Sequence, residues 1–104
     1  MEYTSDYLIE KFKPAVKALV TGEGDARSRV RDAYGEFGHL RVEDAPKAIA
    51  EDLKWIFDRV YSYRRVDEEW QIVAATKLKT GMKNKTATKI AERIFRIYET
   101  IRRD

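Results

Sequence analysis

Residues 44–63 read DAPKAIAEDLKWIFDRVYSY, and this stretch decides the fold that we expect for the chain. Asp44 is a favourable N-cap residue, and Pro46 suits the first helical turn, where no backbone N–H is needed. Apolar residues then recur along one side at about 3.6 residues per turn. They are Ile49, Ala50, Leu53, Ile56, Phe57 and Val60. The stretch predicts a helix over residues 44–63 that forms the centre of the core.

Two helices are predicted before this stretch. The first begins at Thr4 or Ser5, and Pro14 predicts a kink or a fresh start within it, because proline removes a hydrogen bond and crowds the preceding turn. The second has Asp25 as its cap and stops at Gly38.

Two more helices are predicted after it. One covers residues 68–79 with Asp67 as its cap, and its apolar pattern is the least regular of the set. The other covers residues 86–102 and has a broad apolar face, made of Ala87, Ile90, Ala91, Ile94, Ile97, Tyr98 and Ile101. No segment shows sustained polar–apolar alternation between hairpin turns, so we expect no strands. The predicted fold is all-α, a single-domain irregular bundle of four to five helices over residues 1–104.

Length and composition are those of a globular protein and exclude several kinds of site. The chain has 104 residues, 43% hydrophobic and 38% charged, which suits one domain with one core. It contains no cysteine, which excludes disulfides, thiol catalysis and cysteine-ligated metals. No segment resembles a signal peptide or approaches the roughly 20 apolar residues of a membrane span. We therefore expect a cytoplasmic protein that needs no cofactor and contacts no membrane.

Catalytic and metal-binding groups are scarce. His39 is the only histidine, and it lies beside Gly38 at a predicted helix end, where a structural role explains it. The acidic clusters lie at predicted helix starts, where capping and the helix dipole account for an acid. Asp25, Asp44 and Asp67 are therefore interpreted as caps, and not as catalytic or metal-binding residues. The sequence predicts a protein that is not an enzyme and has no metal site.

Charge is unevenly distributed along the chain. Residues 1–52 hold 8 basic and 11 acidic residues, a net charge of −3, and residues 53–104 hold 13 and 7, a net charge of +6. Basic residues at helical spacing can follow the phosphates of a nucleic acid. The candidate nucleic-acid-binding residues are Lys77, Lys79, Lys83, Lys85, Lys89, Arg93 and Arg96. A solvated outer face is the other interpretation of this pattern, and both stay open.

Trp55 lies on the predicted helix about 160° from the apolar stripe, at about 100° per residue. An exposed Trp with Arg and Tyr neighbours is typical of a protein-binding hot spot. The candidate partner-binding residues are Trp55, Arg59 and Tyr63. The alternative is that Trp55 packs under the first helix or the N-terminal arm, because a central helix can bury two faces.

A protein partner is our first expectation, and DNA or RNA is the second. The net charge is only +3, the acidic first half would repel a phosphate backbone, and Trp55 has no evident role in phosphate recognition. We therefore expect a small non-enzymatic binding or regulatory protein that acts through a protein–protein interface. The alternative is a nucleic-acid-binding module that uses the basic helices of residues 77–103.

Overall fold

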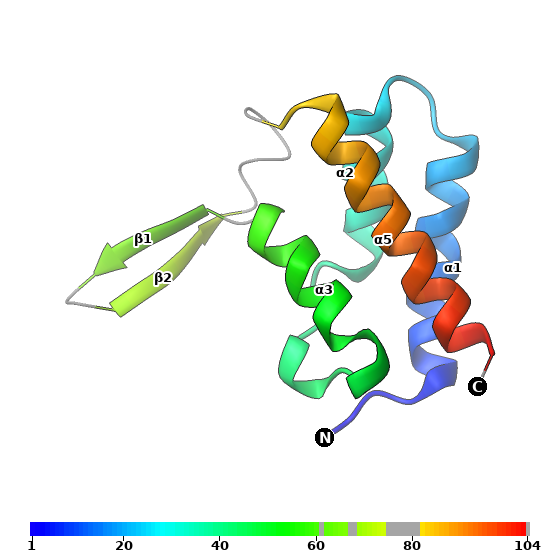
Figure 1. Ribbon diagram of the computed structural model, residues 1–104, viewed down its shortest axis with the longest axis horizontal. Helices are drawn as coiled ribbons and strands as arrows, with labels where there is room; N and C mark the ends of the chain where they lie inside the picture. The colour runs from blue at the N-terminus through cyan, green and yellow to red at the C-terminus, as the bar shows by residue number, and fades with distance from the viewer. Residues whose placement is uncertain (61, 67–68, 75–81, 104) are drawn as a thin grey trace.

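The computed structural model describes residues 1–60, 62–66, 69–74 and 82–103, with side chains for 1–60 and 82–103. Its compact part is an all-α globule, as the sequence predicts (Figure 1). In the described residues it consists of four helices and one 3-10 turn. These are α1 (Ser5–Thr21), α2 (Ala26–Phe37), the 3-10 turn η1 (Val42–Asp44), α3 (Lys47–Val60) and α5 (Asn84–Arg102).

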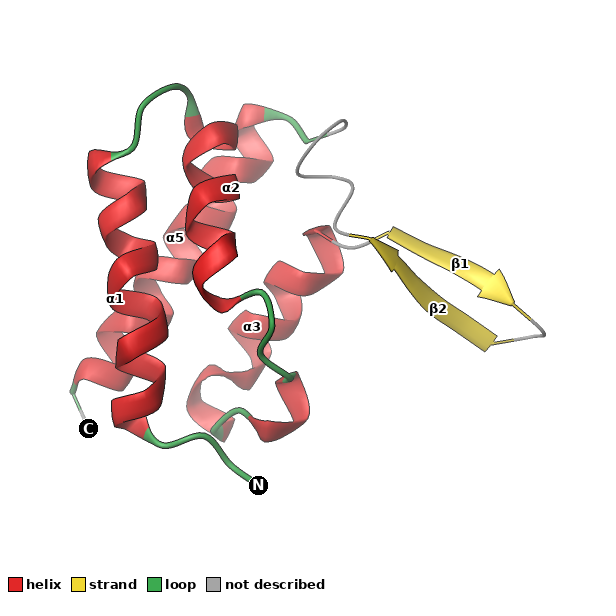
Figure 2. Cartoon of the chain, turned by 180° about the vertical axis from the view of Figure 1, so that it is seen from behind, coloured by secondary structure: helices red, strands yellow, loops and turns green. Residues whose placement is uncertain are grey.

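α5 is the helix at the centre of the bundle. It packs against α1, α2 and α3, and Figures 1 and 2 show it running across them. The expectation that the helix of residues 44–63 forms the centre is wrong in this respect, since α3 packs mainly on α5 and η1. Length gives the reason, because α5 has 19 residues and α3 has 14. Only the longer helix extends along the α1–α2 pair and along α3.

One apolar core joins the four helices. Phe12 of α1 stacks on Phe37 of α2 with ring centroids 4.8 Å apart, and Phe37 stacks on Phe57 of α3 at 6.4 Å. The predicted stripe on α3 is confirmed, with five of its six residues buried and Ala50 half-buried. The buried apolar side chains are Leu8, Phe12, Ala15, Val30, Ala33, Phe37, Leu40, Ile49, Leu53, Ile56, Phe57, Val60, Met82, Ala87, Ile90, Ile94, Ile97 and Ile101.

The ends of the first two helices follow the sequence prediction closely. The Thr4 hydroxyl accepts a hydrogen bond from the Tyr7 amide at 3.2 Å, and the Asp25 carboxylate accepts one from the Ser28 amide at 3.1 Å. Each contact satisfies an amide of a first helical turn that has no partner within the helix. Gly38 ends α2 as predicted. α1 continues through Pro14 without a fresh start.

The start of α3 differs from the prediction that Asp44 caps it. Asp44 is the last residue of η1, and the Pro46 carbonyl accepts the first bonds of α3, from the Ile49 and Ala50 amides at 3.0 Å each. Ala45 is extended, with φ −82° and ψ 144°, because a residue that precedes proline avoids the helical region. The helix therefore begins after the proline, and it ends at Val60.

Residues 62–66 and 69–74 form a two-stranded antiparallel sheet, coloured yellow in Figure 2. β1 (Ser62–Val66) pairs with β2 (Glu69–Ala74), so that Tyr63 is opposite Ile72 and Arg65 is opposite Trp70. The predicted helix over residues 68–79 is therefore wrong for residues 69–74. Its cap Asp67, residue 68 and residues 75–79 lie outside the described residues. The physical reason is composition, because β-branched and aromatic residues, which favour strands, are frequent in both strands.

Candidate functional site

Trp55 lies at the seam between α3 and α5, held between two arginines. The guanidinium carbon of Arg59 is 3.7 Å from the centroid of the Trp55 ring system, and that of Arg93, from α5, is 4.5 Å away. Arg59 also donates a hydrogen bond to the Trp55 carbonyl at 3.2 Å. A cation over an indole ring is attracted by the negative face of the π-system. The half-buried Trp55 ring is therefore held by charged groups from both helices.

Asp52 organises these arginines. Its carboxylate accepts a hydrogen bond from Arg93 Nη1 at 2.7 Å and from Arg96 Nε at 3.0 Å, with a further short contact from Arg96 Nη2. Hydrogen bonds from Arg96 and Arg93 lower the pKa of the Asp52 carboxyl below its usual value, although partial burial opposes them. The same contact raises the pKa of Arg96. We call Asp52, Trp55, Arg59, Arg93 and Arg96 the Trp55 cluster.

The structure brings together only part of the predicted partner-binding set. Trp55 and Arg59 are neighbours, whereas the side chain of Tyr63 lies outside the described part of the chain. Trp55 does not project freely into solvent, because Arg93 covers it from α5. The sequence predicts Arg93 only as a candidate phosphate contact and gives no sign that Asp52 is its partner. An acid on α3 and basic residues along the last helix were the available signals, but their pairing depends on how the two helices pack.

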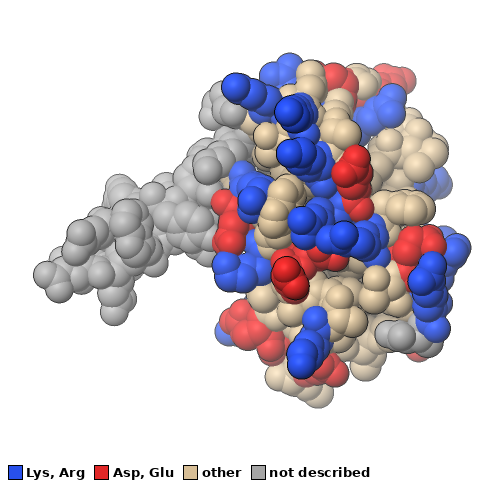
Figure 3. All heavy atoms as spheres, viewed as in Figure 1, with Lys and Arg blue, Asp and Glu red and all other residues tan. Residues whose placement is uncertain are grey.

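The predicted nucleic-acid-binding residues divide into three groups. Lys83, Lys85 and Lys89 are exposed and form no ion pair with any described residue. Arg93 and Arg96 are engaged by Asp52. Lys77 and Lys79 lie outside the described residues. In Figure 3 the basic side chains run over α5 with acidic side chains between them.

The sequence reasoning missed Phe95, which lies on α5 and is 51% exposed. Its position opposite the isoleucine-rich face of that helix was a signal that could have found it. His39 is exposed after α2, and its Nε2 atom lies 3.2 Å from the Tyr7 hydroxyl. Among the described side chains, no group of three or more His, Asp or Glu residues is placed to hold a metal ion.

Comparison with known proteins found no matching family model, no similar curated protein and no similar solved structure. Within the described ranges, no helix combines the length and the apolar character needed to cross a membrane.

Proposed function

We propose that this chain is a small non-enzymatic binding protein that acts through a protein–protein interface centred on the Trp55 cluster. The observation that carries the proposal is a tryptophan ring held at the seam of two helices by Arg59 and Arg93. Trp and Arg are among the residues most enriched in binding hot spots. The cysteine-free sequence suits the reducing cytoplasm, where we expect the protein to act.

The contacts inside the cluster support this proposal because they order its side chains before a partner arrives. Immobilising a flexible side chain on binding costs free energy, so a side chain that is already held costs less. Arg93 is held by both the Asp52 carboxylate and the Trp55 ring, and its side chain remains 29% exposed. The cluster contains three arginines and one aspartate, so its net charge is positive. An acidic protein surface is therefore the complementary partner.

The experiment is a pull-down from host lysate with the wild-type protein, repeated after nuclease treatment. We expect a captured protein that persists after nuclease and is lost with Trp55→Ala and with Arg59→Ala. Lys47→Ala is the matched control, because Lys47 is exposed at the other end of the same helix. Circular dichroism checks that each variant folds. Equal capture by folded Trp55→Ala and Arg59→Ala would contradict the assignment of the interface.

Nucleic-acid binding is the second candidate, and it is favoured by the exposed Lys83, Lys85 and Lys89, which pair with no acidic side chain in the described part of the chain. If these three lysines contact a DNA duplex, the logarithm of the affinity should fall with the logarithm of the salt concentration at a slope of about −2.7. Reversal of Lys85 and Lys89 to Glu should then abolish binding. If neither duplex nor single-stranded DNA nor RNA binds at low salt, this candidate is excluded.

A further inference from the structure

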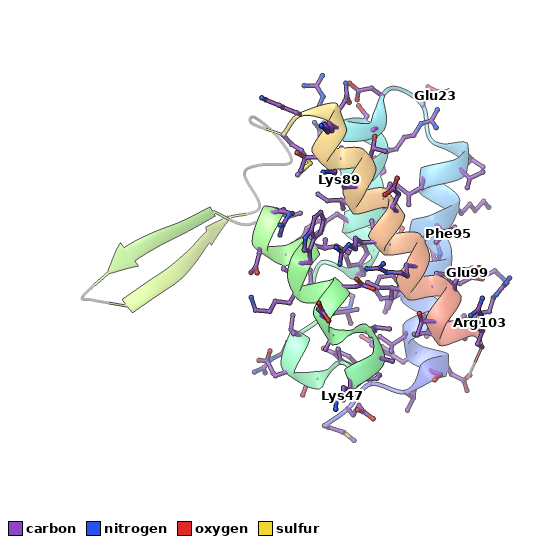
Figure 4. The ribbon with its side chains drawn as sticks, viewed as in Figure 1. Glu23, Lys47, Lys89, Phe95, Glu99 and Arg103 are labelled. Atoms are coloured by element: carbon purple, nitrogen blue, oxygen red, sulfur yellow. The ribbon has the colours of Figure 1, made fainter. Side chains whose placement is uncertain are left out.

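The outward face of α5 carries an alternating pattern of charge around an exposed aromatic ring. Glu92 projects about 180° from the mean direction of the buried isoleucines, at about 100° per residue. Lys89, Phe95, Arg96 and Glu99 lie on the same outward face, within about 60° of Glu92 by the same geometry. Glu99 is half-buried and the other four are exposed. Figure 4 labels Lys89, Phe95 and Glu99 along this face.

The signs of these charges make the face complementary to itself. Along the helix they read Lys89 positive, Glu92 negative, Arg96 positive and Glu99 negative. Residue 94 is the midpoint of Glu92 and Arg96, and it is also the midpoint of Lys89 and Glu99. If a second α5 lies antiparallel across a two-fold axis at this point, each of the four charges meets one of opposite sign. A parallel arrangement would instead place like charges together.

We propose that a second copy of this chain docks on the outward face of α5 and forms an antiparallel two-fold dimer. Two-fold interfaces use the same patch on both subunits, which a self-complementary pattern satisfies. Phe95 is one residue from the axis, so the two Phe95 rings meet near the centre, where apolar burial contributes most. Arg96 keeps its contacts to Asp52 through Nε and Nη2, which leaves the Nη1 donors for Glu92 of the second copy.

The ends of the helix limit the overlap. The same axis places Lys85 opposite Arg103, and these like charges lie about 14 Å from the axis at about 1.5 Å per residue. Packed helices cross at an angle, so they diverge with distance from the crossing point. The central positions from Lys89 to Glu99 therefore form the contact, and the ends stay apart in solvent.

The test is sedimentation equilibrium of the full chain at low ionic strength, where exposed charges are least screened. We expect the wild type to dimerise at a concentration below about 1 mM and Phe95→Asp to be monomeric. Lys89→Glu and Glu99→Lys should each weaken the dimer about tenfold or more, because each change turns two attractive contacts into repulsive ones. Thr88→Ala is a control on the same helix that changes no charge.

Mixing the two charge variants gives the decisive result. Lys89→Glu and Glu99→Lys together restore opposite signs at both symmetric contacts, so an equimolar mixture should form a heterodimer as readily as the wild type forms its dimer. Circular dichroism confirms that each variant is folded. A wild type that stays monomeric at about 1 mM overturns the proposal. So does a mixture of the charge variants that associates no better than either variant alone.

Discussion

Asp52→Asn tests whether the ion pairs between α3 and α5 stabilise the bundle. The change keeps the size of the side chain but removes the negative charge of the carboxylate, which accepts hydrogen bonds from Arg93 and Arg96. The Arg96 side chain is 59% exposed, and exposed pairs contribute only about 0–1 kcal/mol. The Arg93 side chain is 29% exposed, and charge-assisted hydrogen bonds contribute about 1.5–3 kcal/mol. After solvent screening we expect a loss of about 1–2 kcal/mol in the free energy of unfolding, measured with urea at neutral pH.

The pH dependence of the stability that Asp52 contributes gives a second test of its ion pairs. The pKa of Asp52 is lowered in the folded state, so its contribution is present above its unfolded value of about 4 and is lost as the pH falls through the folded value. The difference in the free energy of unfolding between the wild type and Asp52→Asn should therefore become smaller below about pH 4. Glu43→Gln is the matched control, because Glu43 and its partner Arg41 are both exposed. Equal stability of wild type and Asp52→Asn at neutral pH would refute the reasoning.

Three other changes test the fold, each by urea or thermal denaturation. Leu53→Ala should lower the free energy of unfolding by about 2–5 kcal/mol, because Leu53 is fully buried. A loss below about 0.5 kcal/mol would show that Leu53 does not belong to the core. Gly35→Ala should raise the free energy of unfolding by about 0.5–1 kcal/mol, because this helical position has open space for a methyl group. Gly38→Ala should instead destabilise the protein, because its methyl group would lie 2.6 Å from the Tyr34 ring. Asp25→Ala should destabilise α2. Hydrogen bonds from Ser28 and Arg27 lower the pKa of Asp25 to about 2, so the loss of stability should be full above the unfolded pKa of about 4 and should shrink as the pH falls from there toward 2.

Local patterns in the sequence predicted most of the bundle. The cap at Asp25 and the stop at Gly38 gave the bounds of α2, since capping depends on residues close in the chain. The apolar face of the last helix was also correct, and Ile90 and Ile94 are fully buried there. These features follow from hydrogen bonding and periodicity within one segment.

The errors arose where neighbours outside the pattern decide the structure. Asp44 has the chemistry of a cap, but Pro46 forces the residue before it out of the helical region, so α3 starts later. The strand of residues 69–74 pairs with a partner strand, and that pairing is not visible in a helical pattern. Asp52 and Arg93 are 41 residues apart, and only the packing of α3 on α5 brings them together. The candidate site could therefore be predicted only in part.

Photo-crosslinking tests the central claim, that the Trp55 cluster is a protein-binding surface, most directly. A photoreactive benzophenone amino acid replaces the exposed Asp58, which lies one turn from Trp55 on α3, and the control carries it in place of Lys47. After irradiation in the host, mass spectrometry identifies the adducts. We predict that a specific protein is crosslinked from position 58 and not from position 47. Adducts to nucleic acid, or the same proteins captured equally from both positions, would contradict the claim.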